Sequence, residues 1–194
     1  MKLEQKVTTL FSTSIYIGKY VGNIDELSLE CKREKSQSSG RVCSNIGGWQ
    51  SEDFDGKKIQ KFIENQLQES AQEWGIYDSL TVGNYWYNIN TSKDQNHPHT
   101  HPGSILSGII YLNCPLNCSP VIFLNPNHLL ISSYINSLSN LSFNSYLGLH
   151  YIKQPNNGDL IIFPSWLEHY VPVGNYEGER ISLSFNVIKT NETN

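Results

Sequence analysis

Apolar residues recur with a helical period only in the first part of the chain. Residues 56–74 give the clearest pattern, because their apolar side chains fall at spacings of three and four and form one stripe. The members of this stripe are Ile59, Phe62, Ile63, Leu67, Ala71 and Trp74. Asp53 or Asp55 is placed to cap this helix, and Gly75 to end it. Residues 25–35 predict a shorter helix, since their acidic start suits a helix N-terminus.

From residue 80 onward the pattern changes to short segments rich in Val, Ile, Tyr and Phe, which is typical of strands. The predicted strands are 80–89, 107–112, 121–124, 147–152, 158–163, 169–173 and 180–188. Residues 7–22 predict one or two further short strands. Short strands at fairly even spacing after a helical preface favour a mainly β protein, a jelly roll or sandwich with helices packed outside. We expect a single domain over 1–194, in which 1–79 supply strands and supporting helices and 80–188 form the β core.

Composition narrows the classes of function. Charged residues make up only 16% of the chain, the formal net charge is −4, and no run of basic residues stands out. A protein that follows nucleic-acid phosphates needs a stripe of Lys and Arg, so we expect no nucleic-acid partner. The chain has no apolar stretch of about 20 residues, and charges replace the apolar region of a signal peptide near the N-terminus. We therefore expect no membrane segment and a cytoplasmic location, where the cysteines default to free thiols.

A cluster of histidines is the strongest chemical feature. Three of the six histidines fall within residues 97–101. Side chains at i and i+2 of an extended backbone point the same way, so His99 and His101 can reach one metal ion. His97 is an alternative ligand if Pro98 does not turn the chain away. A further ligand must come from elsewhere, and His169, at the start of a predicted strand, is the natural candidate.

The last predicted strand carries a candidate anion-binding residue. Its residues alternate strictly, so that a polar face opposes an apolar face that we expect to pack under the 56–74 helix. The polar face consists of Arg180, Ser182, Ser184 and Asn186, and the apolar face of Ile181, Leu183, Phe185 and Val187. A hairpin turn centred near 174–175 would place Arg180 opposite His169. The guanidinium group could then hold a carboxylate through two parallel hydrogen bonds, with the Ser182 hydroxyl adding one more.

Imidazole ligands beside an anchored organic acid are typical of oxygenases that use iron and 2-oxoglutarate, in which the protein leaves metal positions open for co-substrate and dioxygen. Several motifs point the same way. They are Ser44-Asn45, Gly47-Gly48-Trp49-Gln50-Ser51, YWYNIN at 85–90, HTHPGS at 99–104, LSGIIY at 106–111, GDLIIFPSWLEH at 158–169 and RISLSFN at 180–186. With these motifs the sequence resembles the 2-oxoglutarate/Fe(II)-dependent oxygenases of bacteria and phages, which are related to prolyl-hydroxylase-type enzymes.

The resemblance implies a double-stranded β-helix (jelly roll) that binds Fe(II) and uses 2-oxoglutarate as co-substrate. It assigns His99 and His169 as metal ligands. The wider superfamily has Asp or Glu at the third position of its first motif, where this sequence has His101. If His101 binds the metal, the site has three neutral ligands and keeps an extra unit of positive charge.

The same resemblance implies a co-substrate site. Arg180 matches the basic residue that binds the distal carboxylate of 2-oxoglutarate, and Ser182 lies beside it on the same face. Tyr87, Asn88 and Tyr111 lie on strands that commonly line such pockets. If the source is a phage, the expected location is the cytoplasm of its host.

The leading hypothesis is a dioxygenase that hydroxylates a substrate with release of succinate and CO2. A peptide or protein side chain is expected as substrate by analogy only, and a small molecule remains open. The alternatives are a three-histidine, cupin-like metalloenzyme without 2-oxoglutarate and a catalytically silent jelly-roll binding module. A homodimer and a substrate-lid role for the irregular residues 125–145 both remain open.

Overall fold

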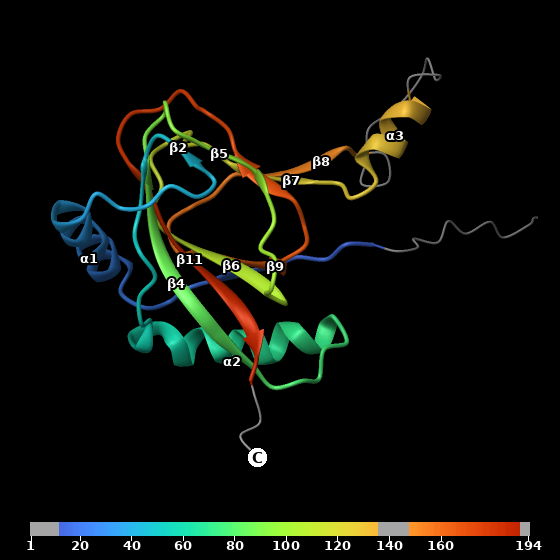
Figure 1. The fold of residues 1–194 in the computed structure, drawn as a ribbon, viewed down its shortest axis with the longest axis horizontal. Coiled ribbons are helices and arrows are strands. Elements are labelled where there is room, and N and C mark those ends of the chain that lie inside the picture. Colours follow the sequence, from blue (N-terminus) through green and yellow to red (C-terminus); the bar gives the residue numbers. More distant parts are fainter. Residues whose placement is uncertain (1–11, 136–147, 191–194) are drawn as a thin grey trace, which may run out of the picture.

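The computed structural model describes residues 12–135 and 148–190, and these form two antiparallel β-sheets with helices outside them (Figure 1). The major sheet has the strand order β1-β9-β6-β11-β4-β3, and the minor sheet has the order β2-β5-β10-β7-β8. The strands are β1 (Tyr16–Lys19), β2 (Asn45–Ile46), β3 (Trp49–Gln50), β4 (Leu80–Asn90), β5 (Gln95–His99), β6 (Leu106–Asn113), β7 (Val121–Leu124), β8 (His150–Lys153), β9 (Asp159–Pro164), β10 (His169–Val171) and β11 (Arg180–Lys189). The prediction of a mainly β protein is confirmed.

Both predicted N-terminal helices are present as α1 (Ile24–Gln37) and α2 (Lys57–Glu73). The Asn23 side chain caps α1 by accepting a hydrogen bond from the Glu26 backbone N–H at 3.1 Å. At the start of α2, the Asp55 carboxylate accepts from the Lys57 N–H at 3.1 Å, although Gly56 holds the N-cap position itself. Gly75 follows the end of α2 with a φ of +72°, a left-handed conformation that favours glycine.

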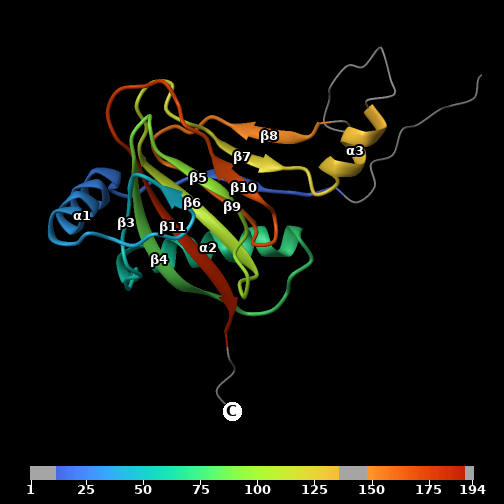
Figure 2. The ribbon, with the colours of Figure 1, turned by 45° about the horizontal axis from the view of Figure 1, so that its top comes forward.

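The two helices cover one face of the major sheet, and α2 runs across its strands in both views (Figures 1 and 2). The stripe on α2 supplies Ile59, Ile63 and Leu67 to the core, together with the apolar face predicted for β11. Leu183 and Phe185 of that face have no exposed surface. The prediction that this face packs under the helix is confirmed.

A third helix, α3 (His128–Ile135), projects from the end of β7 and buries none of its residues (Figure 1). It falls in the segment 125–145 that the sequence suggested as irregular, and residues 136–145 of that segment lie outside the described residues. Of the strands predicted in 7–22, β1 is present, and residues 1–11 also lie outside the described part. No helix in 12–135 or 148–190 is long and apolar enough to cross a membrane.

The predicted hairpin of the last two strands is wrong. β10 pairs with β5 and β7 in the minor sheet, whereas β11 pairs with β4 and β6 in the major sheet. Arg180 therefore lies opposite Asn90, and His169 lies opposite His99. The physical reason is that β4 and β6 occupy both edges of β11 along most of its length, so no edge remains for β10. The chain between them crosses from one sheet to the other.

Candidate metal centre and co-substrate pocket

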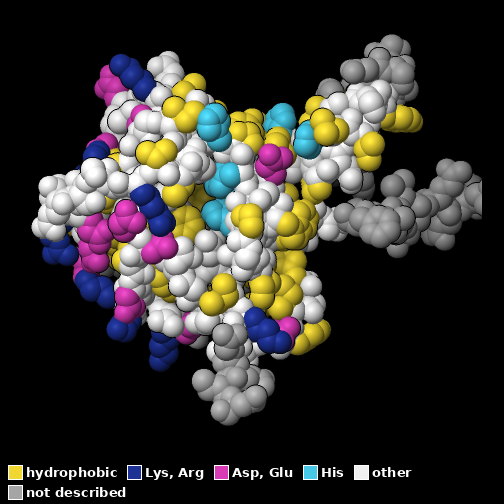
Figure 3. Space-filling model, in the orientation of Figure 1, with side chains coloured by type: hydrophobic (Ala, Val, Ile, Leu, Met, Phe, Trp, Pro, Cys, Tyr) yellow, Lys and Arg dark blue, Asp and Glu magenta, His cyan; other side chains and the backbone are white. Residues whose placement is uncertain are grey.

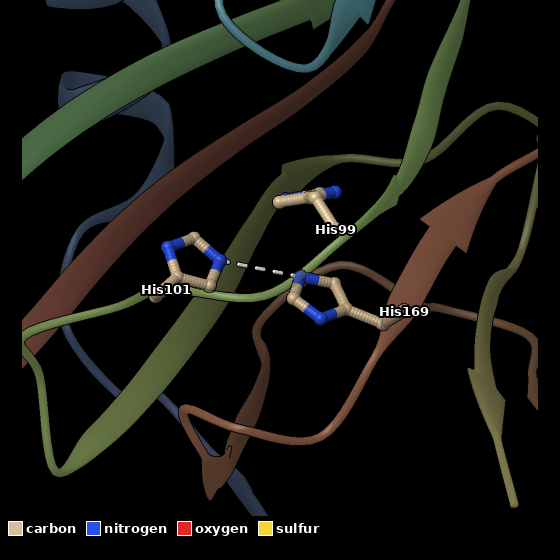
Figure 4. Close-up of side chains that lie close together, drawn as sticks. All are labelled: His99, His101 and His169. Carbon is tan, nitrogen blue, oxygen red and sulfur yellow. Dashed lines mark hydrogen bonds between the residues drawn. The ribbon is translucent and has the colours of Figure 1, made fainter. Parts of the chain in front are cut away.

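The three histidines predicted as ligands come together at one point of the minor sheet. His99 ends β5, His101 follows two residues later, and His169 begins β10 directly opposite His99. One nitrogen atom from each ring lies within 4.8 Å of the others. The Nε2 atoms of His101 and His169 are 3.3 Å apart, as the dashed line in Figure 4 marks. Two nitrogens that bind one metal at about 2.1 Å and a right angle are about 3 Å apart, so this spacing fits neighbouring ligands.

Backbone carbonyl groups orient two of these rings. His99 Nδ1 is 2.7 Å from the His97 carbonyl oxygen, and His169 Nδ1 is 2.9 Å from the Leu167 carbonyl oxygen. A carbonyl oxygen only accepts, so each Nδ1 carries the proton and each Nε2 keeps its lone pair for a metal. The exposed His97 side chain lies outside the cluster, so the alternative in which His97 replaces a ligand is not favoured here.

Burial keeps the three imidazoles neutral. Desolvation lowers the pKa of His99, and it lowers the pKa of His101 to about 4 and that of His169 to about 3, with a smaller contribution from the charge of His99 in both cases. A neutral imidazole is the form that binds a metal ion. Among the described residues, the clustered ligand atoms include no carboxylate. The donor set fits a borderline first-row metal ion such as Fe(II), which imidazole suits.

A cavity of about 500 Å³ separates the histidines from the major sheet. Figure 3 shows histidine side chains on the wall of a hollow in this face of the molecule. The opposite wall consists of the alternate residues of two strands, Asn84, Trp86, Asn88 and Asn90 of β4 and Arg180, Ser182, Ser184 and Asn186 of β11. The whole polar face predicted for β11 therefore lines the cavity.

Arg180 is a buried charged group of this wall. Its side chain is buried, with only 2% of the residue exposed. One terminal nitrogen donates to the Tyr111 hydroxyl at 3.3 Å, and the guanidinium carbon lies 4.9 Å from the centre of the Tyr111 ring. Its Nε has no hydrogen-bond partner, and no carboxylate of the described residues pairs with it. A buried cation without a counter-charge is strongly unfavourable, so this group is suited to an anionic ligand.

Of the other residues predicted to bind the co-substrate, two line the cavity and two do not. Ser182 and Asn88 line the cavity, and the Asn88 amide donates to Ser184 Oγ at 3.1 Å. Tyr111 is fully buried and reaches the cavity only through Arg180. The prediction that Tyr87 lines the pocket is wrong. Its ring lies on the helix-covered face of β4 and stacks on the Phe54 ring, with 4.6 Å between the ring centres.

Asn90 is a residue that the sequence reasoning missed. It lines the cavity beside Arg180, with which it is paired between β4 and β11. Asn90 is 2% exposed, and its side-chain oxygen has no hydrogen-bond partner. Its amide can turn to present either its oxygen or its NH2 group to a ligand. Its position two residues after Asn88 could have predicted this role, because residues two apart in a strand lie on the same face.

Comparisons with known proteins agree with this geometry. A family model described as "Putative 2OG-Fe(II) oxygenase" matches residues 84–186. A search of curated protein sequences finds no match.

Among solved structures, a prolyl-4-hydroxylase of Pseudomonas putida is similar, with 14% identity, a TM-score of 0.64 and coverage of 93% of this chain and 95% of that chain. The viral collagen prolyl hydroxylase vCPH of Paramecium Bursaria Chlorella virus-1, in complex with 2-oxoglutarate, has 11% identity, a TM-score of 0.60 and coverage of 91% and 96%. HygX of Streptomyces hygroscopicus, with nickel and 2-oxoglutarate bound, has 12% identity, a TM-score of 0.54 and coverage of 92% and 84%.

At identities this low, structural similarity shows the fold alone. This similarity confirms the predicted jelly roll. The family model covers more than half of the chain, from the middle of β4 to β11, and includes all three clustered histidines and Arg180. The chain belongs to the family of 2OG-Fe(II) oxygenases, oxidoreductases that use iron and 2-oxoglutarate.

Proposed function

We propose that this oxygenase hydroxylates an organic substrate in a reaction that converts 2-oxoglutarate into succinate and CO2. The observation that carries this proposal is a buried Arg180, without a carboxylate partner, across one cavity from three neutral histidines. A metal site and an anion site on facing walls suit a ligand that is a chelator at one end and a carboxylate at the other.

In this proposal His99, His101 and His169 hold the metal. The orientation of His99 and His169 by backbone carbonyls supports their role, because ligands already in position lose little entropy on binding. His101 replaces the acidic ligand of the wider superfamily, and its Nε2 lies next to that of His169. The iron would supply the binding and activation of dioxygen.

Arg180 binds the far carboxylate of 2-oxoglutarate. The guanidinium offers its unpaired Nε–H, while Tyr111 holds a terminal nitrogen and fixes the plane of the group. Ser182 and Asn90 lie on the same wall and can donate to the same carboxylate. The deep burial of this end excludes water, which strengthens each charge-assisted hydrogen bond.

The rest of the cavity holds the substrate. Its walls carry neutral polar groups from Gln50, Asn84 and Asn186, and at its edge Arg41 is already paired with Asp53. This lining suits a polar, uncharged group such as a peptide or protein side chain more than an apolar ligand. Two similar structures are described as prolyl hydroxylases. A third similar structure, SnoK from nogalamycin biosynthesis, with a TM-score of 0.63 and 8% identity, is described as a carbocyclase. The fold by itself therefore does not determine the substrate.

We also propose that the chain works as one domain. The helices α1 and α2 share one buried core with β4, β6 and β11. The helices of 1–79 would thus support the β core of 80–188 that carries the site.

The test is an anaerobic calorimetric titration with Fe(II), followed by 2-oxoglutarate. We expect one iron per chain and 2-oxoglutarate binding that requires the metal. His169→Ala should lose iron, whereas Arg180→Ala should keep iron and lose 2-oxoglutarate. His150→Ala and Arg33→Ala are matched controls, because both residues are exposed and lie outside the cavity.

Other outcomes would replace the proposal. Iron binding without 2-oxoglutarate binding would support the three-histidine, cupin-like alternative. A protein that binds no metal would support the silent binding module. If both ligands bind, incubation with peptide pools and detection of an added oxygen atom by mass spectrometry tests the hydroxylase activity.

A further inference from the structure

Two cysteines outside the proposed active site form a close pair. Cys114 and Cys118 lie in the connection between β6 and β7, and both are free thiols. A tight turn brings them together, since the Cys118 N–H donates to the Pro115 carbonyl at 3.0 Å. Within this turn Asn117 has a φ of +58°, the left-handed conformation that such a reversal requires. The two thiols flank this turn and interact, since the Cys118 thiol raises the pKa of Cys114 and the Cys114 thiol lowers that of Cys118.

The surroundings of the pair hold it in place. Cys118 has no exposed surface, and Gln154 contacts it twice, with Nε2 at 2.7 Å from the carbonyl oxygen and 3.9 Å from the sulfur. The Cys114 N–H donates to the Asn157 side chain at 2.6 Å, and this residue is partly exposed. Of the two residues, Cys114 is therefore the one that a small oxidant can reach.

The electrostatics of the pair favour reactivity. The hydrogen bond from Cys114 lowers the pKa of the Cys118 thiol, and the positive charge of Arg180 lowers it further, against the effect of burial. The same interaction raises the pKa of Cys114, so the first proton that the pair loses leaves the negative charge on Cys118. A thiolate is the form of cysteine that reacts with oxidants and disulfides.

We propose that Cys114 and Cys118 form a redox modification site, a dithiol that hydrogen peroxide closes into an intramolecular disulfide. The Cys118 thiolate takes the proton of Cys114 and the Cys114 sulfur attacks the peroxide, so that an S–O bond forms, the O–O bond breaks and the departing hydroxide is protonated to water by Cys118. Cys118 then attacks the Cys114 sulfur, so that the S–S bond forms and the S–O bond breaks to release a second water. Two thiols are oxidised and one peroxide is reduced. Nothing in this site depends on the proposed hydroxylase activity.

The experiment uses the full-length Cys43→Ser protein in the presence of a metal chelator, because the exposed Cys43 could otherwise link two chains. Equimolar hydrogen peroxide is added, and free thiols and disulfide-linked peptides are measured by mass spectrometry over time. We expect a Cys114–Cys118 disulfide that dithiothreitol reverses, while Cys31, which has no exposed surface, stays reduced. Oxidation of the folded protein should be about tenfold faster than that of the same chain in guanidinium chloride, because the fold holds the sulfurs together.

Two further results decide the matter. Cys114→Ser should leave Cys118 unmodified for much longer than in the parent, since its sulfur is buried. The proposal is overturned if the folded and unfolded chains form the disulfide at the same rate. It is also overturned if Cys114 is oxidised beyond the sulfenic state without a disulfide, because a positioned partner thiol would have intercepted it.

Discussion

The two faces of the major sheet are made by the same strands and have opposite characters. On β4, Tyr85 and Tyr87 face the helices, whereas Asn88 and Asn90 face the cavity. On β11 the same alternation separates the aliphatic and aromatic core residues from Arg180 and its polar neighbours. The helix-covered face can be stabilised by burial of apolar area alone. The cavity face keeps polar groups in a confined space, some without protein partners, which is the arrangement expected of a binding surface.

This comparison predicts that substitutions on the helix-covered face change stability and that substitutions on the cavity face change ligand binding. Neighbouring residues of one strand provide matched pairs for this test.

The largest effect on stability is expected for Phe185→Ala. Its ring is fully buried under the helices, and its loss should lower the free energy of unfolding by about 3–5 kcal/mol. Denaturant unfolding measures this change. Ser184→Ala, one residue away on the cavity face, should cost about 1 kcal/mol, since it removes one hydrogen bond with Asn88. A Phe185→Ala protein that remains folded but loses 2-oxoglutarate affinity would contradict the separation of the two faces.

The largest effect on binding is expected for Arg180→Met. Two charge-assisted hydrogen bonds contribute about 1.5–3 kcal/mol each, so 2-oxoglutarate affinity should fall at least about 100-fold. In the absence of ligand the free energy of unfolding should stay level or rise, because a buried cation without a counter-charge is replaced by an apolar side chain. Calorimetry and denaturant unfolding test the two parts. A clear loss of stability without ligand would show that the contacts of Arg180 with Tyr111 outweigh the cost of burying its charge.

Asp159 lies outside both the helix-covered core and the cavity lining, so it tests the sheet away from both. Its carboxylate pairs with Lys19 at 2.6 Å and with Lys153 at 2.8 Å, and Asp159→Asn should cost about 1–3 kcal/mol at neutral pH without changing 2-oxoglutarate affinity. Burial raises the pKa of Asp159, but hydrogen bonds from Lys153, Lys19 and the Asn156 backbone outweigh it and hold the pKa below its usual value.

The sign of the pH effect at Asp159 follows from this lowered pKa. The stabilisation is fully present above the pKa of the unfolded chain, about 3.9, and is lost as the pH falls through the lower pKa of the folded protein. The stabilities of wild type and Asp159→Asn should therefore begin to converge below about pH 4 and become similar below the pKa of the folded protein. A difference that stays constant well below about pH 4 would show that the charge of Asp159 is not what stabilises the fold.

The smallest effects are expected for two tyrosine hydroxyls on opposite faces. Tyr111→Phe removes the acceptor that orients Arg180, so 2-oxoglutarate affinity should fall by about 0.5–1.5 kcal/mol, a few-fold change. Tyr87→Phe is the matched control, because its buried hydroxyl has no hydrogen-bond partner. It should leave affinity unchanged and keep or slightly raise stability. Equal losses of affinity in both variants would argue against a positioning role for Tyr111.

Several features could be predicted from the sequence because they depend on local periodicity. The stripe of 56–74 predicts a helix with one buried face, and the alternation of 180–188 predicts which residues share a face. The spacing of His99 and His101 places both rings on one side of the chain, and the structure brings both to His169. The periodicity of side chains along a helix or strand is set by backbone geometry, which acts over a few residues.

Other features were decided only by the tertiary structure, because they depend on which distant segments share hydrogen bonds. Periodicity cannot tell which strands flank β11, and the expected hairpin with β10 was wrong for that reason. Periodicity places Tyr87 and Asn88 on different faces of β4, but it does not show which residue points into the cavity. A shift of one residue in strand pairing would exchange the two faces. The placement of Asn90 beside Arg180 follows from the pairing of β4 with β11 in the major sheet. The meeting of Arg180 and the histidines at one cavity follows from packing of the two sheets. The sequence by itself determined the chemical groups and their local faces, and the packing of the sheets decided which groups meet across the cavity.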